Sequence, residues 1–209
     1  MSRSLELLMQ APVLPVLVIE RVEDAVPLAR ALLAGGLPVL EVTLRTEAAF
    51  EAIAKIKAEV DGVYCGAGTV THKGQVELLE QAGADFAVSP GYSQPLGSAL
   101  RLSRIPLLPG IATASELMVC LDRGYKCFKF FPAEAMGGVK TIRSLGGPFP
   151  EARFCPTGGI STDNLRTYLD LPSVVTAGGS WIATPDAIAK GDWAGIEAEA
   201  TRAVALTKD

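Results

Sequence analysis

The residue best suited to covalent chemistry is a lysine in an apolar segment. Lys129 is the only charged residue of Cys127–Pro132, which also contains three phenylalanines. A lysine is rarely buried without a partner or a function. Apolar surroundings disfavour its ammonium form, and the neutral amine can attack a ketone to form a Schiff base. The alternative is a lysine whose stem lies along apolar surface while its amine pairs with an acid.

A second apolar segment, Pro38–Leu44, contains Glu41 and is followed directly by Arg45. Strand alternation places Glu41, Thr43 and Arg45 on one face. If that face points into the interior, Glu41 can transfer protons and Arg45 can bind a carboxylate through two parallel hydrogen bonds. The alternative is a structural ion pair of Glu41 with Arg45 or Lys129, and such a pair is also compatible with catalysis.

Two glycine pairs have the character of phosphate-binding loops. Gly158 and Gly159 precede a predicted helix, and Gly178 and Gly179 precede Ser180. Bare backbone amides and a helix N-terminus bind anions. Each pair also follows a predicted strand, so the two together indicate an anion site, whereas one pair alone would fit a plain turn.

Other kinds of site are hard to assemble from this sequence. His72 is the only histidine, so neither a histidine-based metal site nor a catalytic triad is expected, and His72 is predicted to lie in a solvated loop. A phosphate-loop signature is absent, and the glycine spacing in Gly66–Thr69 does not fit a dinucleotide site. We therefore expect no metal and no cofactor.

Composition narrows the classes of partner. Of the 209 residues, 49% are hydrophobic and 20% are charged, and the net charge of −4 comes with scattered basic residues. This disfavours nucleic acid and anionic membranes as partners. No apolar run reaches the roughly 20 residues of a spanning helix. The four cysteines lack paired or zinc-type spacing, which favours reduced thiols in the cytoplasm.

Short apolar runs alternate with amphipathic stretches along the chain, as in parallel α/β proteins. We predict one domain, 1–209, folded as a (β/α)8 TIM barrel with an extra helix at 1–10. A doubly wound open sheet is the alternative. The predicted strands are Val13–Ile19, Pro38–Leu44, Val63–Val70, Phe86–Pro90, Pro106–Ile111, Cys127–Phe131, Arg153–Thr157 and Val174–Gly178. The clearest helical stretches are Glu23–Ala34, Glu47–Val60, Gln75–Ala82, Ser115–Arg123 and Thr162–Leu169.

Five segments, in the same order along the chain, closely resemble the 2-keto-3-deoxy-6-phosphogluconate (KDPG) aldolase family. The resemblance extends from about Val13 to Trp193, and the lysine-bearing segment is its most specific part. The segments are Leu40-Glu41-Val42-Thr43-Leu44-Arg45-Thr46, Gly66-Ala67-Gly68-Thr69-Val70, Ser89-Pro90-Gly91, Phe128-Lys129-Phe130-Phe131-Pro132-Ala133-Glu134 and Phe154-Cys155-Pro156-Thr157-Gly158-Gly159-Ile160-Ser161.

The resemblance implies a role for each candidate residue. Lys129 would form the Schiff base and Glu41 would be the acid and base. Arg45 and Thr69 would bind the pyruvate carboxylate. The remaining roles are pocket walls at Pro90 and Phe131, a substrate contact at Thr157, and phosphate binding by Gly158, Gly159, Gly179 and Ser180.

The resemblance also implies a reaction. It is a metal-independent (class I) cleavage of KDPG to pyruvate and glyceraldehyde 3-phosphate, and of 4-hydroxy-2-oxoglutarate to pyruvate and glyoxylate. The implied setting is a cytoplasmic homotrimer in the Entner–Doudoroff pathway, with a phosphorylated keto acid and pyruvate as its small-molecule partners. Three other readings stay open: a phosphosugar decarboxylase or isomerase, a metal-dependent aldolase, and a non-catalytic phosphosugar-binding protein.

Overall fold

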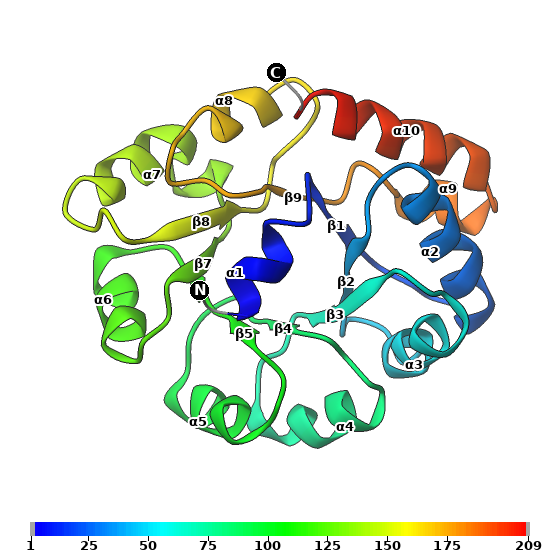
Figure 1. The fold of residues 1–209 in the computed structure, drawn as a ribbon, viewed down its shortest axis with the longest axis horizontal. Coiled ribbons are helices and arrows are strands. Elements are labelled where there is room, and N and C mark those ends of the chain that lie inside the picture. Colours follow the sequence, from blue (N-terminus) through cyan, green and yellow to red (C-terminus); the bar gives the residue numbers. More distant parts are fainter. Residues whose placement is uncertain (1–2, 208–209) are drawn as a thin grey trace.

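Parallel strands lie at the centre of the molecule and helices surround them (Figure 1). The computed structural model describes residues 3–207, so residues 1–2 of the predicted N-terminal helix and residues 208–209 lie outside the described part. The strands within it are β1 Leu14–Leu17, β2 Val39–Thr43, β3 Tyr64–Gly68, β4 Ala87–Val88, β5 Leu107–Leu108, β6 Gly110–Ile111, β7 Cys127–Phe130, β8 Arg153–Pro156 and β9 Gly178–Gly179.

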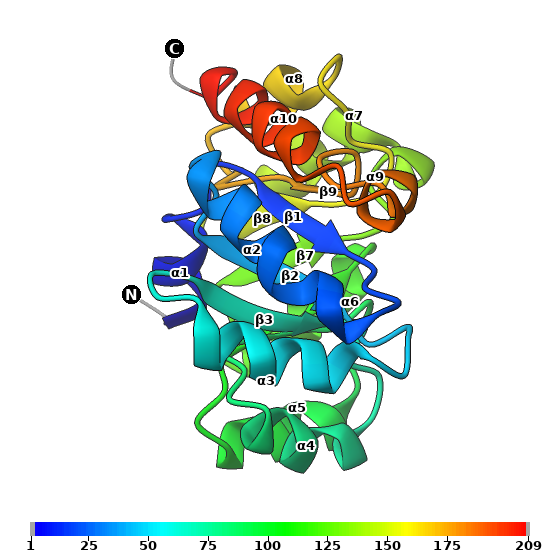
Figure 2. The same cartoon turned by 90° about the vertical axis from the view of Figure 1, so that its right-hand side faces the viewer.

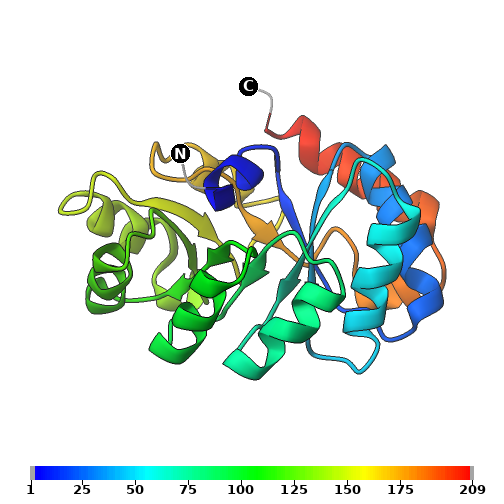
Figure 3. The same ribbon diagram turned by 60° about the horizontal axis from the view of Figure 1, so that its bottom comes forward.

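The helices follow the strands in alternation and lie on their outer side (Figure 3). All five helical stretches predicted above contain a helix, with ends shifted by up to three residues. The α-helices are α1 Arg3–Leu8, α2 Ala25–Ala34, α3 Ala49–Glu59, α4 Val76–Gln81, α5 Gln94–Leu102, α6 Ala114–Asp122, α7 Gly138–Gly146, α8 Leu165–Leu169, α9 Pro185–Ala189 and α10 Trp193–Ala205. Short 3-10 helices are η1 Val22–Asp24, η2 Lys73–Gln75 and η3 Glu134–Met136.

The strands form a curled parallel arrangement of two sheets. The first has the order β5-β4-β3-β2-β1-β9 and the second the order β6-β7-β8. A doubly wound sheet carries helices on both faces. Here the helices surround the curled strands on the outer side, which disfavours the doubly wound alternative.

Two predicted strands differ from the observed ones for backbone reasons. The run Pro106–Ile111 is divided into β5 and β6 at Pro109, which has no N–H to donate to a strand ladder. The run Val174–Gly178 pairs with the β8 region only through isolated bridges, Phe154 with Val174 and Thr157 with Gly178. The predicted strand there is consequently reduced to β9, which pairs with Leu14 and Pro15 of β1.

The strand residues are apolar on both faces because both faces are covered. Every residue of β1, β2 and β7 is buried, as expected where helices pack outside and other strands lie inside. The outer faces of the strands and the inner faces of the helices form one large core, which includes Leu28 and Leu32 of α2 and Ala200 of α10. Figure 2 shows α2 and α10 side by side on this face.

Helix α1 covers the amino ends of the strands. Leu7 and Leu8 pack against Leu14, Val39 and Phe86, all near the start of a strand or just before it. In Figure 2, α1 lies at the end opposite to the arrowhead of β1. The carboxyl ends of the strands, where barrel enzymes hold their chemistry, are therefore the end without this helix.

Within residues 3–207, no helix has both the length and the apolar character that crossing a membrane requires.

Candidate active site

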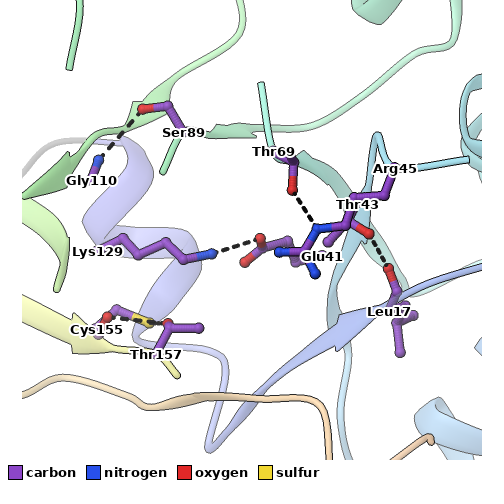
Figure 4. A network of polar contacts seen from close by, with 10 residues as sticks. All are labelled: Leu17, Glu41, Thr43, Arg45, Thr69, Ser89, Gly110, Lys129, Cys155 and Thr157. Atoms are coloured by element: carbon purple, nitrogen blue, oxygen red, sulfur yellow. Dashed lines mark hydrogen bonds and ion pairs between the residues drawn. The ribbon is translucent and has the colours of Figure 1, made fainter. Parts of the chain in front are cut away.

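Lys129 and Glu41 meet across the interior of the molecule. Lys129 is on β7 in the smaller sheet, and Glu41 is on β2 in the larger one. The amine Nζ of Lys129 donates to Oε1 of Glu41 over 2.9 Å, although the two residues are 88 positions apart in the chain. Figure 4 shows the two side chains pointing toward one another. The fold therefore joins two residues that the sequence singled out independently.

The pair is almost fully removed from solvent. The side chain of Lys129 is 6% exposed and that of Glu41 is 0% exposed. On the Lys129 side, Nζ lies 5.4 Å from the ring centroid of Phe131. Cys155 is the register partner of Lys129 on β8, and burial raises the pKa of its thiol to about 12, so this neighbour stays uncharged. The low polarity around the pair strengthens the attraction between the two charges.

The second carboxylate oxygen of Glu41 is in a different situation from the first. Oε2 is buried and has no hydrogen-bond partner among the described residues. A buried acceptor without a partner is costly, so it marks a place where a bound molecule can supply the missing donor. Glu41 thus holds the amine with one oxygen and offers the other to a ligand.

Gly68 at the end of β3 makes room for the Glu41 carboxylate. A Cβ atom placed on Gly68 would lie 2.6 Å from Cγ of Glu41 and closer still to Oε1. Gly68 pairs in register with Thr43 of the neighbouring strand β2, and Thr43 lies two residues after Glu41 on that strand. Any side chain at this position would push the carboxylate away from Lys129.

Arg45 and Thr69 lie at the carboxyl ends of β2 and β3. Nε of Arg45 donates to Oγ1 of Thr69 over 3.2 Å, as Figure 4 shows. Thr69 has a φ of 58°, which is unusual for a β-branched residue and characteristic of functional positions. Thr43, the third polar residue of the predicted face, instead donates to the backbone oxygen of Leu17 over 2.8 Å.

A cavity of about 250 Å³ opens beside these residues, at the ends of β1, β7, β8 and β9. Seven of the predicted site residues line it, namely Arg45, Phe131, Thr157, Gly158, Gly159, Gly179 and Ser180. Lys129 is not one of the lining residues, but its amine lies 5.4 Å from the ring centroid of Phe131, which does line the cavity. The cavity thus combines a guanidinium, a hydroxyl and both glycine pairs.

Four predicted residues do not line the cavity: Lys129, Glu41, Thr69 and Pro90. Thr69 is hydrogen-bonded to the lining residue Arg45, and Pro90 is exposed after β4, where its backbone packs closely against Gly110. Three lining residues were not singled out from the sequence: Val16, Val18 and Ile160. They are ordinary core residue types, and only their position at strand ends could have drawn attention to them. Gly178, the other member of the second glycine pair, also lines the cavity.

Among residues 3–207, His, Cys, Asp and Glu side chains form no group of three or more that could hold a metal ion. His72, predicted in a loop, is exposed at the start of η2, where its backbone N–H donates to Gln75.

The space at Gly68 gives a direct test of the site geometry. We expect Gly68→Ala to lower the free energy of unfolding by about 1–3 kcal/mol, because the added methyl group overpacks the interior and disturbs a buried ion pair. Urea denaturation monitored by circular dichroism measures this loss. Gly91→Ala is the control, since no atom lies within 4 Å of its added methyl group. Equal stabilities for the two variants would contradict the close packing described here.

Comparison with known proteins identifies the family. The family model for KDPG and KHG aldolase, in which KHG is 4-hydroxy-2-oxoglutarate, matches residues 5–199. The chain is similar to the 2-dehydro-3-deoxy-phosphogluconate aldolase of Pseudoalteromonas atlantica, with 57% identity over 196 residues that cover 94% of this chain and 91% of that protein.

Solved structures agree with the sequence match. A crystal structure of the KDPG aldolase of Legionella pneumophila, with pyruvate captured at low pH as a covalent carbinolamine, has a TM-score of 0.93 and 46% identity, covering 96% of this chain and 97% of that one. The 2-keto-3-deoxy-6-phosphogluconate aldolase of Zymomonas mobilis with 3-phosphoglycerate has a TM-score of 0.92 and 47% identity, covering 98% and 96%. The predicted resemblance is confirmed, and the chain belongs to the KDPG and KHG aldolase family.

Proposed function

We propose that Lys129 is the residue on which this aldolase forms its Schiff base, with Glu41 as the proton-transfer group. The chain is a carbon–carbon lyase that cleaves KDPG to pyruvate and glyceraldehyde 3-phosphate, a reaction of the Entner–Doudoroff pathway. The observation that carries the residue assignment is the buried 2.9 Å contact between Nζ and Oε1, close to the ring of Phe131 on the wall of the cavity.

The first half of the reaction uses the contact directly. A proton passes from Nζ of Lys129 to Glu41, which leaves a neutral amine. The amine attacks the C2 keto carbon of the substrate and forms a carbinolamine. Glu41 then returns its proton to the carbinolamine hydroxyl, which leaves as water and gives an iminium ion at C2 and an ionised Glu41. The iminium can accept the electrons of the C3–C4 bond when that bond breaks.

In the second half, Glu41 acts as a base. Its carboxylate accepts the proton of the C4 hydroxyl, the C3–C4 bond breaks, and its electrons pass into the iminium to give an enamine. The aldehyde, glyceraldehyde 3-phosphate, leaves. Protonation of the enamine at C3 and addition of water release pyruvate and the free amine. The unpartnered Oε2 of Glu41 is the atom best placed to exchange these protons.

The cavity supports a specific orientation of the substrate. Arg45, held by Thr69, offers its guanidinium to the carboxylate, and Thr157 faces the reacting carbons with Phe131 as a wall. The wall role predicted for Pro90 stays a prediction, since Pro90 does not line the cavity. The phosphate would bind to backbone and hydroxyl donors at the far side of the cavity, at Gly158, Gly159, Gly179 and Ser180.

The same groups suit 4-hydroxy-2-oxoglutarate as a second substrate. It has the C2 ketone and the C4 hydroxyl that the mechanism needs, and its cleavage gives pyruvate and glyoxylate. It carries no phosphate, so the glycine loops would not contribute to its binding.

We further propose that the two sheets close into one (β/α)8 barrel that forms a single domain in the cytoplasm. Two observations support closure: the backbone N–H of Val175 donates to Phe154 over 3.0 Å beside the isolated bridges, and only Pro109 separates β5 from β6. Four buried cysteines without disulfides favour a reducing compartment.

We also propose a homotrimer. Arg101 of α5 donates to the backbone oxygen of Arg123 at the end of α6, so these helices are adjacent, and they expose Leu102, Met118 and Val119. Apolar side chains exposed on neighbouring helices suit a subunit interface. Light scattering on the purified protein should give three times the mass of the 21.9 kDa chain. A monomeric mass at micromolar concentration would contradict the trimer.

Borohydride reduction in the presence of pyruvate tests the Schiff base. We expect a reduced pyruvyl adduct on Lys129 in peptide mass mapping, unaffected by a chelator. Lys129→Met should lose both the adduct and KDPG cleavage because no other amine occupies its position. Lys126→Met and Lys140→Met are matched controls, since both lysines are exposed on the surface and should leave turnover intact.

The outcomes separate the alternatives. An adduct on Lys126 or Lys140 instead of Lys129 would contradict the assignment. Turnover abolished by the chelator would favour the metal-dependent aldolase. The absence of an adduct together with bound phosphosugar would favour a binding protein, or a decarboxylase or isomerase when product forms.

Replacing Glu41 by Gln tests proton transfer. The amide keeps the shape of the side chain but cannot accept the proton, so kcat for KDPG should fall by roughly 10²–10⁴-fold. Steady-state kinetics measure this fall, and borohydride trapping at Lys129 shows whether the amine is still present and reachable. Wild-type turnover in this variant would remove Glu41 from the mechanism.

A further inference from the structure

The wall of the cavity at Gly158 and Gly159 is held from behind by two residues that take no part in the proposed chemistry. Glu134 is the first residue of η3, and Tyr168 is on α8. The hydroxyl of Tyr168 donates to Oε1 of Glu134 in a short hydrogen bond. Neither residue lines the cavity, so neither would touch a ligand bound there.

Glu134 contacts the loop through both backbone and side chain. Its backbone N–H donates to the oxygen of Gly158 over 3.1 Å, and the N–H of Ala133 donates to Thr157 over 2.8 Å. A Cβ atom on Gly159 would lie 2.6 Å from Cγ of Glu134, so the side chain packs directly against the Gly159 backbone. The conformation of the loop therefore depends on where this carboxylate lies.

Helix α8 fixes that position from the other side. Tyr168 is fully buried, and burial together with the hydrogen bond to Glu134 raises the pKa of its hydroxyl, which therefore remains a donor. Asn164, at the start of the same helix, donates to the oxygen of Gly159 over 2.9 Å. The loop is thus attached to α8 twice, once directly through Asn164 and once through the Tyr168–Glu134 pair.

The hydrogen bond also has an electrostatic effect. A free carboxylate beside Gly159 would be close to the place proposed for the substrate phosphate, and like charges repel. The bond to Tyr168 directs Oε1 toward Gly138 of α7, where an added Cβ would lie 3.0 Å from it. The carboxylate is held away from the cavity while its methylene groups support the loop.

We propose that Glu134 and Tyr168 are positioning residues that shape the Gly158–Gly159 loop for the phosphate of the substrate. The inference rests on the proposed function, because that function brings a phosphorylated substrate to this loop. It assigns the pair an effect on recognition of the phosphate and none on the Schiff base at Lys129.

The test compares a phosphorylated substrate with pyruvate, which has no phosphate. Tyr168→Phe removes the hydroxyl alone and should raise KM for KDPG roughly 10-fold, while the rate of borohydride trapping of pyruvate at Lys129 stays within about twofold. Tyr125→Phe is the matched control: Tyr125 is half-buried against Tyr92, away from the loop, and should change neither value.

If Tyr168→Phe folds poorly, variants of Glu134, which accepts the hydrogen bond from Tyr168, keep the test decisive. Glu134→Gln preserves the packing against Gly159 and an oxygen that can accept from Tyr168, so it should raise KM for KDPG less than Glu134→Ala does. Combining Tyr168→Phe with Glu134→Ala should give less than the product of the separate effects, because both remove the same bond.

Two results would overturn the inference while leaving the aldolase intact. One is an unchanged KM for KDPG in both Tyr168→Phe and Glu134→Ala. The other is an equal loss in KDPG cleavage and in pyruvate trapping, which would indicate a general structural role. Failure of the proposed function would be distinct, since wild-type protein itself would then neither cleave KDPG nor form the Lys129 adduct.

Discussion

The site depends on one interaction, the buried contact between Lys129 and Glu41. Removing two charges from water is costly, and their mutual attraction offsets that cost only where the geometry is good and the remaining lone pairs are satisfied. Here the distance is 2.9 Å, but Oε2 of Glu41 has no partner within the described residues. The pair is therefore incompletely stabilised without substrate, and a substrate hydroxyl or water can complete it. Such an arrangement is better explained by catalysis than by stability.

The constraint extends outward from this pair into the fold. The lysine and the glutamate lie on strands of different sheets, so the contact forms only because the parallel strands curl until β2 and β7 face one another. Gly68 is needed because a side chain there would occupy the space of the carboxylate. The burial of the pair, with the ring of Phe131 5.4 Å from Nζ, excludes water. This exclusion strengthens the pair and favours proton transfer within it over exchange with solvent. A substitution at a packing residue near the strand ends, such as Gly68, would therefore also disturb Lys129 and Glu41.

Much of this site could be predicted from the sequence, because a charged residue inside an apolar run has no packing explanation. Lys129 and Glu41 were found this way, and the two glycine pairs were found from their place after predicted strands. The parallel α/β fold followed from the alternation of runs. The strand boundaries did not: Pro109 interrupts a run that is continuous in hydrophobicity, and the positive φ of Thr69 leaves no trace in residue type. Gly68 and the Glu134–Tyr168 pair were missed because their importance lies in contacts between residues distant along the chain, and a lone glycine, glutamate or tyrosine has many ordinary uses.

The proposed phosphate-binding loops and the reacting amine of Lys129 lie on different strands. The amine is on β7, while the loops proposed for the phosphate follow β8 and β9, so the lysine and the two loops come from three strands that are consecutive in the chain. Binding energy gained at a remote group accelerates a reaction only if it holds the reacting carbons in place, which requires a rigid attachment between the two regions. The backbone bonds from Ala133 and Glu134 to the loop after β8 provide that attachment, since these residues directly follow the strand that carries Lys129. In the proposed binding mode, a substrate without a phosphate meets the same amine but gains nothing from this attachment. The proposal therefore assigns the distinction between the two kinds of keto acid to the loop and not to Lys129.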